Sequence, residues 1–311
     1  MEREYSYKLS KLTQDLQMDV VYPSADFERV LIYTGDVNRP GLQLAGCFDH
    51  FEPAHIQLIG RMESAYLEKL TKEERLTKWE ALLERRIPAL IMCHGAEITD
   101  ELISAAKKYD VTVLNAKAHT TEIMSSVIRI VKKEVAPRVT RHGVLVEVYG
   151  IGLLLLGESG VGKSEAAIEL LKRGHRLIAD DAVELKAIDV GVLEGTSPEL
   201  IRHYVELRGI GVIDVRLIFG VGAIKMFQNL HLVVNLAPWK DGDHYDRLGI
   251  NENTVNILGV EVPAITIPVR PGRNLAVILE VAAMNQRQKF MGYNAAIEFS
   301  KQIKKYFEEI S

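Results

Sequence analysis

The N-terminal part of the chain alternates short apolar runs with polar, turn-forming stretches. An amphipathic repeat over residues 4–17 predicts a helix, because its apolar side chains recur at helical spacing. Apolar runs bounded by Gly, Pro, Asn or Asp predict the strands that follow, at residues 19–22, 30–33, 42–45 and 56–59. A second helix is expected over residues 71–86, where Thr71 suits the N-cap and Glu74 has the capping-box position.

Regular alternation of strands and helices follows. The expected strands cover residues 88–92 and 111–115, and the expected helices cover 99–108 and 120–133. Such alternation is typical of a parallel sheet with helices packed on its faces. Residues 132–138 are polar and basic and include a proline, so we predict a linker there. The predicted fold class is therefore α/β with two domains, residues 1–133 and 134–311.

The C-terminal part has more closely spaced strands and fewer helices. Apolar and periodic runs predict strands at 143–149, 153–156, 177–179, 182–187 and 230–236, and helices at 162–173, 274–291 and 295–308. Residues 240–253 are polar and without periodicity, which is typical of a mobile loop.

Composition and charge exclude several classes of protein. Hydrophobic residues make up 47% and charged residues 26% of the 311 residues, as in an ordinary globular protein. The net charge of −4 argues against a nonspecific nucleic-acid binder. Cys47 and Cys93 are too few for a disulfide framework or a four-ligand zinc site, so we predict buried free thiols.

Two observations indicate a soluble, cytoplasmic protein without a membrane partner. The N-terminal stretch MEREYSYKLSKLTQDL carries both charge signs and no apolar core, unlike a signal peptide. The most apolar segment, residues 144–157, contains Glu147 and three glycines, and it is too interrupted for a membrane span of ~20 apolar residues.

The sharpest motif fits the pattern G-x-x-x-x-G-K-[ST] between a predicted buried strand and a predicted helix. Its residues are Gly157, Glu158, Ser159, Gly160, Val161, Gly162, Lys163 and Ser164. Glycines at these positions let backbone N–H groups turn toward phosphate oxygens, and the helix N-terminus adds partial positive charge. Lys163 would reach the terminal phosphates, and Ser164 would offer its hydroxyl to a magnesium ion. The motif predicts nucleotide or phosphate binding.

The motif alone does not name the reaction. The chain has neither the Asn-Lys-x-Asp segment of G-proteins nor a Ser-Gly-Gly-Gln segment of transporter ATPases. The apolar run expected to end in an acid is residues 177–179, which lead directly into Asp180 and Asp181. Paired carboxylates beside a phosphate site can bind a metal or take a proton from an attacking hydroxyl. Which of the two aspartates would be the base stays open.

Further charged residues lie in unusual places. Glu206 and Arg208 interrupt the apolar run 205–215, where they form either an internal ion pair or a magnesium ligand with a phosphate-facing arginine. Arg247 lies in the predicted loop, where an arginine can close over a reacting phosphoryl group. Arg270 and Arg273 flank a Pro-Gly pair just before a predicted helix and suit an anion site.

Four segments together resemble the HPr kinase/phosphorylase family in order and spacing. They read GESGVGKSE, GHRLIADDAVEL, VELRGIGVIDV and PVRPGRN. The resemblance implies a C-terminal P-loop kinase domain similar to the nucleotide domain of phosphoenolpyruvate carboxykinase, and an N-terminal α/β domain of uncertain role. It implies that ATP or pyrophosphate phosphorylates a serine of the phosphocarrier HPr, and that inorganic phosphate removes the phosphoryl group as pyrophosphate. It also implies Mg²⁺, a homohexamer and fructose bisphosphate as an effector.

The resemblance also implies residue roles. The motif from Gly157 to Ser164 would hold the phosphates, with Lys163 stabilising charge and Ser164 and Glu206 binding magnesium. Asp181 would transfer the proton, and His142 and Arg247 match catalytic positions. The phosphate and phosphorolysis residues would be Arg208, Pro268, Val269, Arg270, Pro271, Gly272 and Arg273. Two other classes stay open on the residues alone: a P-loop small-molecule or carboxykinase-like enzyme, and a nucleotide sensor without turnover.

Overall fold

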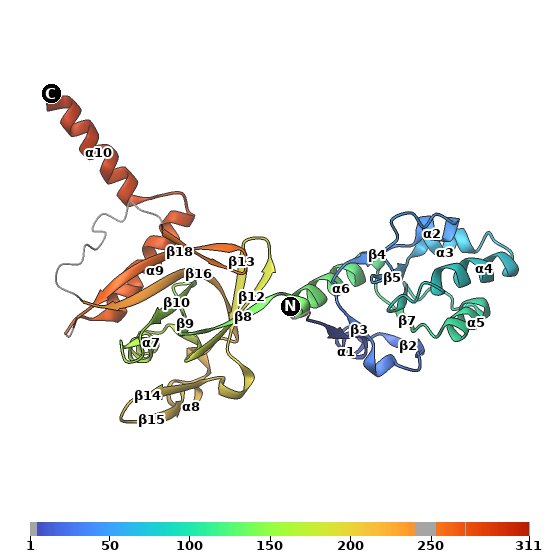
Figure 1. The fold of residues 1–311 in the computed structure, drawn as a ribbon, viewed down its shortest axis with the longest axis horizontal. Coiled ribbons are helices and arrows are strands. Elements are labelled where there is room, and N and C mark those ends of the chain that lie inside the picture. Colours follow the sequence, from blue (N-terminus) through green and yellow to red (C-terminus); the bar gives the residue numbers. More distant parts are fainter. Residues whose placement is uncertain (1–4, 240–252, 271, 311) are drawn as a thin grey trace. The chain divides into compact units, whose positions relative to one another are not determined.

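The computed structural model describes residues 5–239, 253–270 and 272–310 and divides the chain into two compact units (Figure 1). The units are Met1–Ala136 and Pro137–Ser311, so the division falls three residues beyond the predicted boundary. The last helix of the first unit, α6 (Thr120–Val135), takes up most of the predicted linker. Within the described residues, no helix combines the length and the hydropathy that crossing a membrane requires.

The N-terminal unit is a five-stranded sheet with helices on both faces, which confirms the predicted architecture. Its strands, in spatial order, are β2 (Asp19–Tyr22), β7 (Val113–Ala116), β6 (Leu90–Cys93), β5 (Ile56–Ile59) and β4 (Val37–Asn38). All neighbours pair in parallel except β2, which runs antiparallel to β7. The helices are α1 (Leu9–Asp15), α2 (Gly41–Ala45), α3 (Arg61–Leu67), α4 (Lys72–Leu83), α5 (Asp100–Tyr109) and α6.

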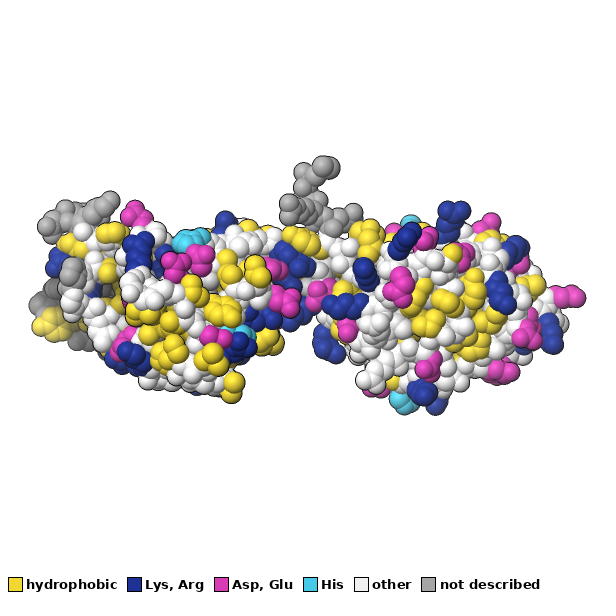
Figure 2. All heavy atoms as spheres, turned by 90° about the horizontal axis from the view of Figure 1, so that it is seen from below, with side chains coloured by type: hydrophobic (Ala, Val, Ile, Leu, Met, Phe, Trp, Pro, Cys, Tyr) yellow, Lys and Arg dark blue, Asp and Glu magenta, His cyan; other side chains and the backbone are white. Residues whose placement is uncertain are grey.

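Two hydrophobic cores sandwich this sheet. One core joins residues of α1 and α6, such as Leu12 and Val127, to one face. The other joins residues of α4 and α5, such as Trp79 and Leu102, to the opposite face. Because both faces are covered, the central strand β6 is apolar throughout rather than alternating. A space-filling view shows acidic and basic side chains interspersed over the surface that faces the viewer (Figure 2).

Local sequence signals set some element boundaries and missed others. The capping box at the start of α4 is confirmed, since Thr71 Oγ1 accepts from the Glu74 N–H and Glu74 Oε2 accepts from the Thr71 N–H. The strand predicted at 42–45 is wrong, because these residues form α2 and bury only Leu44. The first helix begins later than predicted, because β1 (Tyr7–Lys8) pairs with β3 (Leu31–Ile32) instead.

The two cysteines differ in burial. Cys93 is buried, as predicted, and burial raises the pKa of its thiol to about 11. Cys47 is exposed, contrary to the prediction, because the chain turns outward after α2 at Gly46.

At pH 8 about one Cys93 thiol in a thousand is then a thiolate. Iodoacetamide should therefore modify Cys47 and spare Cys93 in the folded protein, as peptide mass spectrometry would show. Equal modification of both cysteines would contradict this burial.

The described residues of the C-terminal unit form a nine-stranded mixed sheet and a separate hairpin. The sheet strands are β8 (Arg138–His142), β9 (Val144–Val148), β10 (Ile151–Gly157), β11 (Arg176–Ala179), β12 (Ala182–Asp189), β13 (Val192–Thr196), β16 (Phe227–Pro238), β17 (Asn253–Ile257) and β18 (Val260–Val269). The hairpin consists of β14 (Tyr204–Leu207) and β15 (Gly211–Asp214). The helices of eight or more residues are α7 (Lys163–Lys172), α9 (Leu275–Phe290) and α10 (Ala295–Ile310).

Strand β10 is buried on both faces. Leu153 and Leu155 face a core that includes side chains of α7 and α9, whereas Leu154 faces a second core on the other side. Strands β10, β16 and β18 run in parallel, with Gly157 opposite Leu236. Their carboxyl ends therefore meet at one edge of the sheet, where ligands of parallel sheets usually bind.

Candidate functional site

The glycine-rich loop connects the end of β10 to the start of α7 and depends on three left-handed glycines. Gly157, Gly160 and Gly162 have φ angles of 145°, 85° and 99°. A Cβ atom at Gly157 would lie 2.4 Å from the Leu236 carbonyl oxygen, so a larger residue does not fit there. Gly162 is the N-cap of α7, and the first N–H groups of a helix have no acceptor within the helix itself. The loop therefore has the geometry of an anion cradle.

Lys163 and Ser164 occupy the floor of this cradle. The Lys163 side chain is buried, and its Nζ donates to the carbonyl oxygens of Gly157 at 2.9 Å and Glu158 at 3.0 Å. The Ser164 hydroxyl donates to Asp180 Oδ1 at 2.9 Å. An ammonium and a hydroxyl thus lie side by side at the helix N-terminus, where a polyphosphate would need them.

Asp180 is a site residue for which the sequence analysis assigned no definite role. It follows β11, is only 5% exposed, and accepts hydrogen bonds from Ser164 and from the Glu206 N–H at 3.3 Å. Burial, and then the neighbouring Asp181 charge, raises the pKa of its carboxyl. The available signal was an apolar run ending in an acid, but the run leads into two acids and the sequence does not separate them. Through these two hydrogen bonds, Asp180 connects helix α7 to strand β14 of the hairpin.

Asp181 and His142 form a pair at the mouth of the cavity. Asp181 lies in a left-handed turn, with φ of 67°, and its carbonyl accepts from the Gly143 N–H. Strands β8 and β12 pair with His142 opposite Ala182, which brings the imidazole beside the carboxylate. Asp181 Oδ1 and His142 Nδ1 are 3.0 Å apart, and both side chains are largely exposed. An exposed carboxylate of this kind can reach the hydroxyl of a docked protein.

The β14–β15 hairpin carries Glu206 and Arg208, which are exposed rather than buried. The apolar run 205–215 therefore does not bury these two charges, because β14 and β15 form a hairpin separate from the main sheet. Arg208 Nη2 instead donates to the Ser159 hydroxyl of the loop at 2.8 Å. Hairpin and loop together enclose a cavity of about 130 Å³. The lining residues are His142, Val144, Ser159, Gly160, Gly162, Lys163, Ser164, Glu165, Asp180, Asp181, Glu206 and Arg208.

The described residues of the predicted segment 268–273 begin at the end of β18, at the same sheet edge, and do not line this cavity. Pro268 and Val269 end β18, and the Arg270 guanidinium lies 3.3 Å above the Trp239 ring. Arg273 Nη1 donates to the Pro268 carbonyl, and Gly272 has a left-handed φ of 81°. Pro271 and Arg247 lie outside the described residues, so their predicted roles have no structural account.

The oxygen donors of the cavity fit magnesium. Ser164 Oγ and the carboxylates of Asp180 and Glu206 line the same small space. The residues that the structure describes include no group of three or more His, Cys, Asp or Glu side chains placed to hold a metal ion by themselves. Mg²⁺ usually takes one or two carboxylates, substrate phosphates and several waters. The site therefore suits a magnesium ion that arrives with a polyphosphate.

A glycine-rich cradle between a buried strand and a helix, faced by carboxylates, defines the class of P-loop proteins that bind nucleoside polyphosphates. Comparison with known families narrows this class. Residues 133–303 match the family described as "HPr Serine kinase C-terminal domain", and residues 7–131 match "HPr Serine kinase N terminus". The chain belongs to the HPr kinase/phosphorylase family, as its motifs predicted.

Two curated relatives match this chain over nearly its whole length, and a solved structure matches about half of it. HPr kinase/phosphorylase of Alkaliphilus metalliredigens is 47% identical over 306 residues, covering 98% of this chain and 99% of the relative. That of Caldanaerobacter subterraneus is 48% identical over 294 residues, covering 94% and 96%. The solved structure of the Hpr(Ser) kinase/phosphatase from Coxiella burnetii is 35% identical, with a TM-score of 0.47, and covers 52% of this chain and 98% of that one.

Proposed function

We propose that this enzyme transfers a phosphoryl group from ATP or pyrophosphate to a serine of HPr, and that it also runs the reverse phosphorolysis as part of carbon catabolite regulation. In the reverse direction, inorganic phosphate attacks phosphoseryl-HPr and pyrophosphate is released. The observation that carries the proposal is the Asp181–His142 pair at the mouth of a cavity whose floor is formed by Lys163 and Ser164. Membership of the family supplies HPr as the protein substrate.

In the kinase direction, the Asp181 carboxylate accepts the proton of the HPr serine hydroxyl as its oxygen bonds to the terminal phosphorus. The bond between that phosphorus and the oxygen bridging to the leaving group then breaks. Lys163 in the cradle offsets charge on the phosphate oxygens, which is most of what phosphoryl transfer requires from a protein. His142 Nδ1, 3.0 Å from Asp181 Oδ1, orients the carboxylate.

In the reverse direction, Asp181 returns the proton to the serine oxygen as that oxygen leaves phosphorus. One carboxylate can do both because forward and reverse reactions share a transition state, so the base of one direction is the acid of the other. Magnesium, when bound, would neutralise charge on the phosphates, and Ser164 and Glu206 are its proposed protein ligands, with buried Asp180 orienting Ser164.

Several finer features belong to the same proposal and rest on the family resemblance. The C-terminal unit would share the nucleotide-domain fold of phosphoenolpyruvate carboxykinase, and segment 268–273 would serve chiefly phosphorolysis. The enzyme would act as a cytoplasmic homohexamer, with fructose bisphosphate as effector. The role of this segment is supported by the parallel pairing of β18 with β16. This pairing places the end of β18, at residue 269, at the same sheet edge as the P-loop.

Replacing Arg247 tests the proposed closing arginine. Arg247→Ala should lower the rate constant of phosphoryl transfer more than it weakens ATP binding, because a closing cation acts mainly on charge that develops during the reaction. We expect a fall of at least about 10-fold in kcat with ATP affinity within threefold of wild type. Stopped-flow transfer and equilibrium ATP titration measure the two quantities. A variant that loses only ATP affinity would contradict this role.

Incubation with HPr and γ-labelled ATP tests the assignment of the substrate. The label should appear on a serine of HPr and on no small molecule. A label on a small metabolite would favour the small-molecule or carboxykinase-like enzyme, and ATP binding without turnover would favour the sensor.

A further inference from the structure

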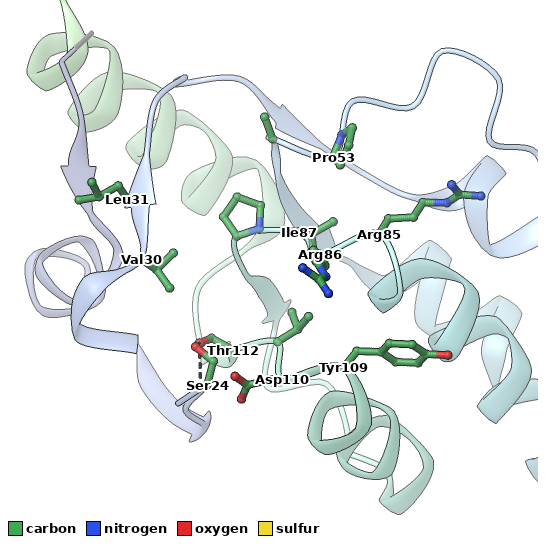
Figure 3. A pocket seen from close by; sticks show the side chains of 13 residues that line it. Ser24, Val30, Leu31, Pro53, Arg85, Arg86, Ile87, Tyr109, Asp110 and Thr112 are labelled. Atoms are coloured by element: carbon green, nitrogen blue, oxygen red, sulfur yellow. Dashed lines mark hydrogen bonds between the residues drawn. The ribbon is translucent and has the colours of Figure 1, made fainter. Parts of the chain in front are cut away.

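The N-terminal unit has a cavity of its own, at the edge of the sheet where its parallel strands begin (Figure 3). The cavity has a volume of about 700 Å³, within the usual range for small-molecule sites. Its lining comes from the segments that precede β5, β6 and β7, from the segment between β2 and β3, and from the first residue of β3. All of these residues belong to the first compact unit, so the cavity is separate from the P-loop site.

A guanidinium without a protein partner faces this cavity. Arg86 lines the cavity and, among the residues that the structure describes, its side chain makes no hydrogen bond or ion pair. Figure 3 shows the Arg86 side chain turned toward the middle of the cavity, whereas Arg85 turns away. The Arg85 guanidinium is engaged elsewhere, 3.8 Å from the centre of the Phe48 ring. Of the two adjacent arginines, only Arg86 is therefore free to bind an anion in the cavity.

An acceptor and a donor face the same space from the other side. Asp110 Oδ1 accepts from the Ala25 N–H at 2.9 Å, and its Oδ2 has no protein partner in the described part of the chain. The buried hydroxyls of Ser24 and Thr112 are 2.9 Å apart and use one of their two protons between them. One hydroxyl proton of the pair therefore has no protein acceptor among the described residues and remains available to a ligand in the cavity.

We propose that this cavity binds a small organic anion that also carries a hydroxyl or ammonium donor. The anionic group would lie on Arg86, and the donor would lie on Asp110 Oδ2. A hydroxyl proton of the Ser24–Thr112 pair would reach a further acceptor of the ligand. The opposite charges of Arg86 and Asp110 form no ion pair with each other, so each is available to a ligand.

Apolar side chains strengthen the case for an organic ligand rather than a bare ion. Val30, Ile87 and Val111 line the cavity between the polar groups. Ile87 and Val111 are buried and give the cavity apolar walls, whereas the charged residues Arg86 and Asp110 are exposed at its rim. A carbon skeleton between the two polar ends would cover these walls, as is usual in small-molecule sites.

Calorimetric titration of the full-length protein tests this site while a non-hydrolysable ATP analogue with magnesium saturates the P-loop. The probes are glycerol 3-phosphate, leucine, inorganic phosphate and glycerol. We expect glycerol 3-phosphate or leucine to bind with a Kd of about 1 mM or tighter. Inorganic phosphate should bind more weakly than the tighter of these two, and glycerol should not bind. Saturation of the P-loop is itself measured first, so failure of the proposed kinase site would be seen separately.

Three variants assign the binding to the proposed groups. Arg86→Gln should weaken binding of the tightest-binding probe at least tenfold. Asp110→Asn should also weaken binding of this probe, and asparagine tolerates the left-handed backbone at residue 110, where φ is 54°. Arg85→Gln is the matched control and should bind within twofold of wild type. Absence of binding by every probe at about 10 mM, or unchanged affinity in Arg86→Gln, would overturn the proposal.

Discussion

Asp181→Asn should remove most of the kinase and the phosphorolysis activity together while leaving ATP affinity within threefold of wild type. The substitution keeps the size of the side chain but removes its ability to take or return a proton. Proton transfer by a positioned side chain is typically worth 10²- to 10⁴-fold, so we expect both rates to fall at least about 100-fold. The left-handed backbone at residue 181, with φ of 67°, suits asparagine as well as aspartate.

Rates of transfer to HPr, rates of pyrophosphate formation and ATP titration would measure these three quantities. Asp189→Asn is a suitable control, because Asp189 ends the same strand β12, is exposed and lines no part of the cavity. Transfer at the wild-type rate in Asp181→Asn would refute the assigned role. Loss of one direction only would contradict the single-carboxylate mechanism.

Lys163→Met should abolish both activities and, unlike Asp181→Asn, should also weaken ATP binding. Methionine approximates the length of lysine but cannot offset phosphate charge from the floor of the cradle, where Lys163 Nζ contacts the Gly157 and Glu158 carbonyls. Single preorganised donors are worth about 10²- to 10³-fold, and Lys163 acts on both the bound and the reacting phosphates. We therefore expect kcat/KM for ATP to fall at least about 1,000-fold.

Lys172→Met is the matched control for this variant. Lys172 is the last residue of the same helix α7, is exposed and has no contact with the cradle, so its replacement should leave both activities near wild type. Thermal unfolding would establish that both variants fold. More than about a tenth of the wild-type rate in folded Lys163→Met would contradict the proposed role of Lys163.

The elements that the sequence predicted well are those whose signals are local. The capping box of α4 and the glycine-rich loop between β10 and α7 each depend on residues a few positions apart. Residues 42–45 were misassigned because so short an apolar run fits a strand or a helical turn, and tertiary burial of Leu44 decides.

The site was predictable where a motif carries its own geometry, and less so where distant segments meet. The eight loop residues follow from the pattern, but the hydrogen bond between Ser164 and Asp180 requires the end of β11 to lie beside the loop helix. The exposure of Glu206 and Arg208 depends on the hairpin leaving the main sheet, which an apolar run cannot reveal. The ring contact of Arg270 likewise depends on Trp239, which is 31 positions earlier in the chain.

The most direct test of the central claim follows one phosphoryl group through both directions in a single preparation. The enzyme first labels HPr with γ-labelled ATP and magnesium, ATP is removed, and inorganic phosphate is then added. The account predicts that labelled pyrophosphate appears in an amount equal to the phosphoserine lost, and that Asp181→Asn blocks both stages. Release of the label as inorganic phosphate, or persistence of either stage at the wild-type rate in Asp181→Asn, would contradict it.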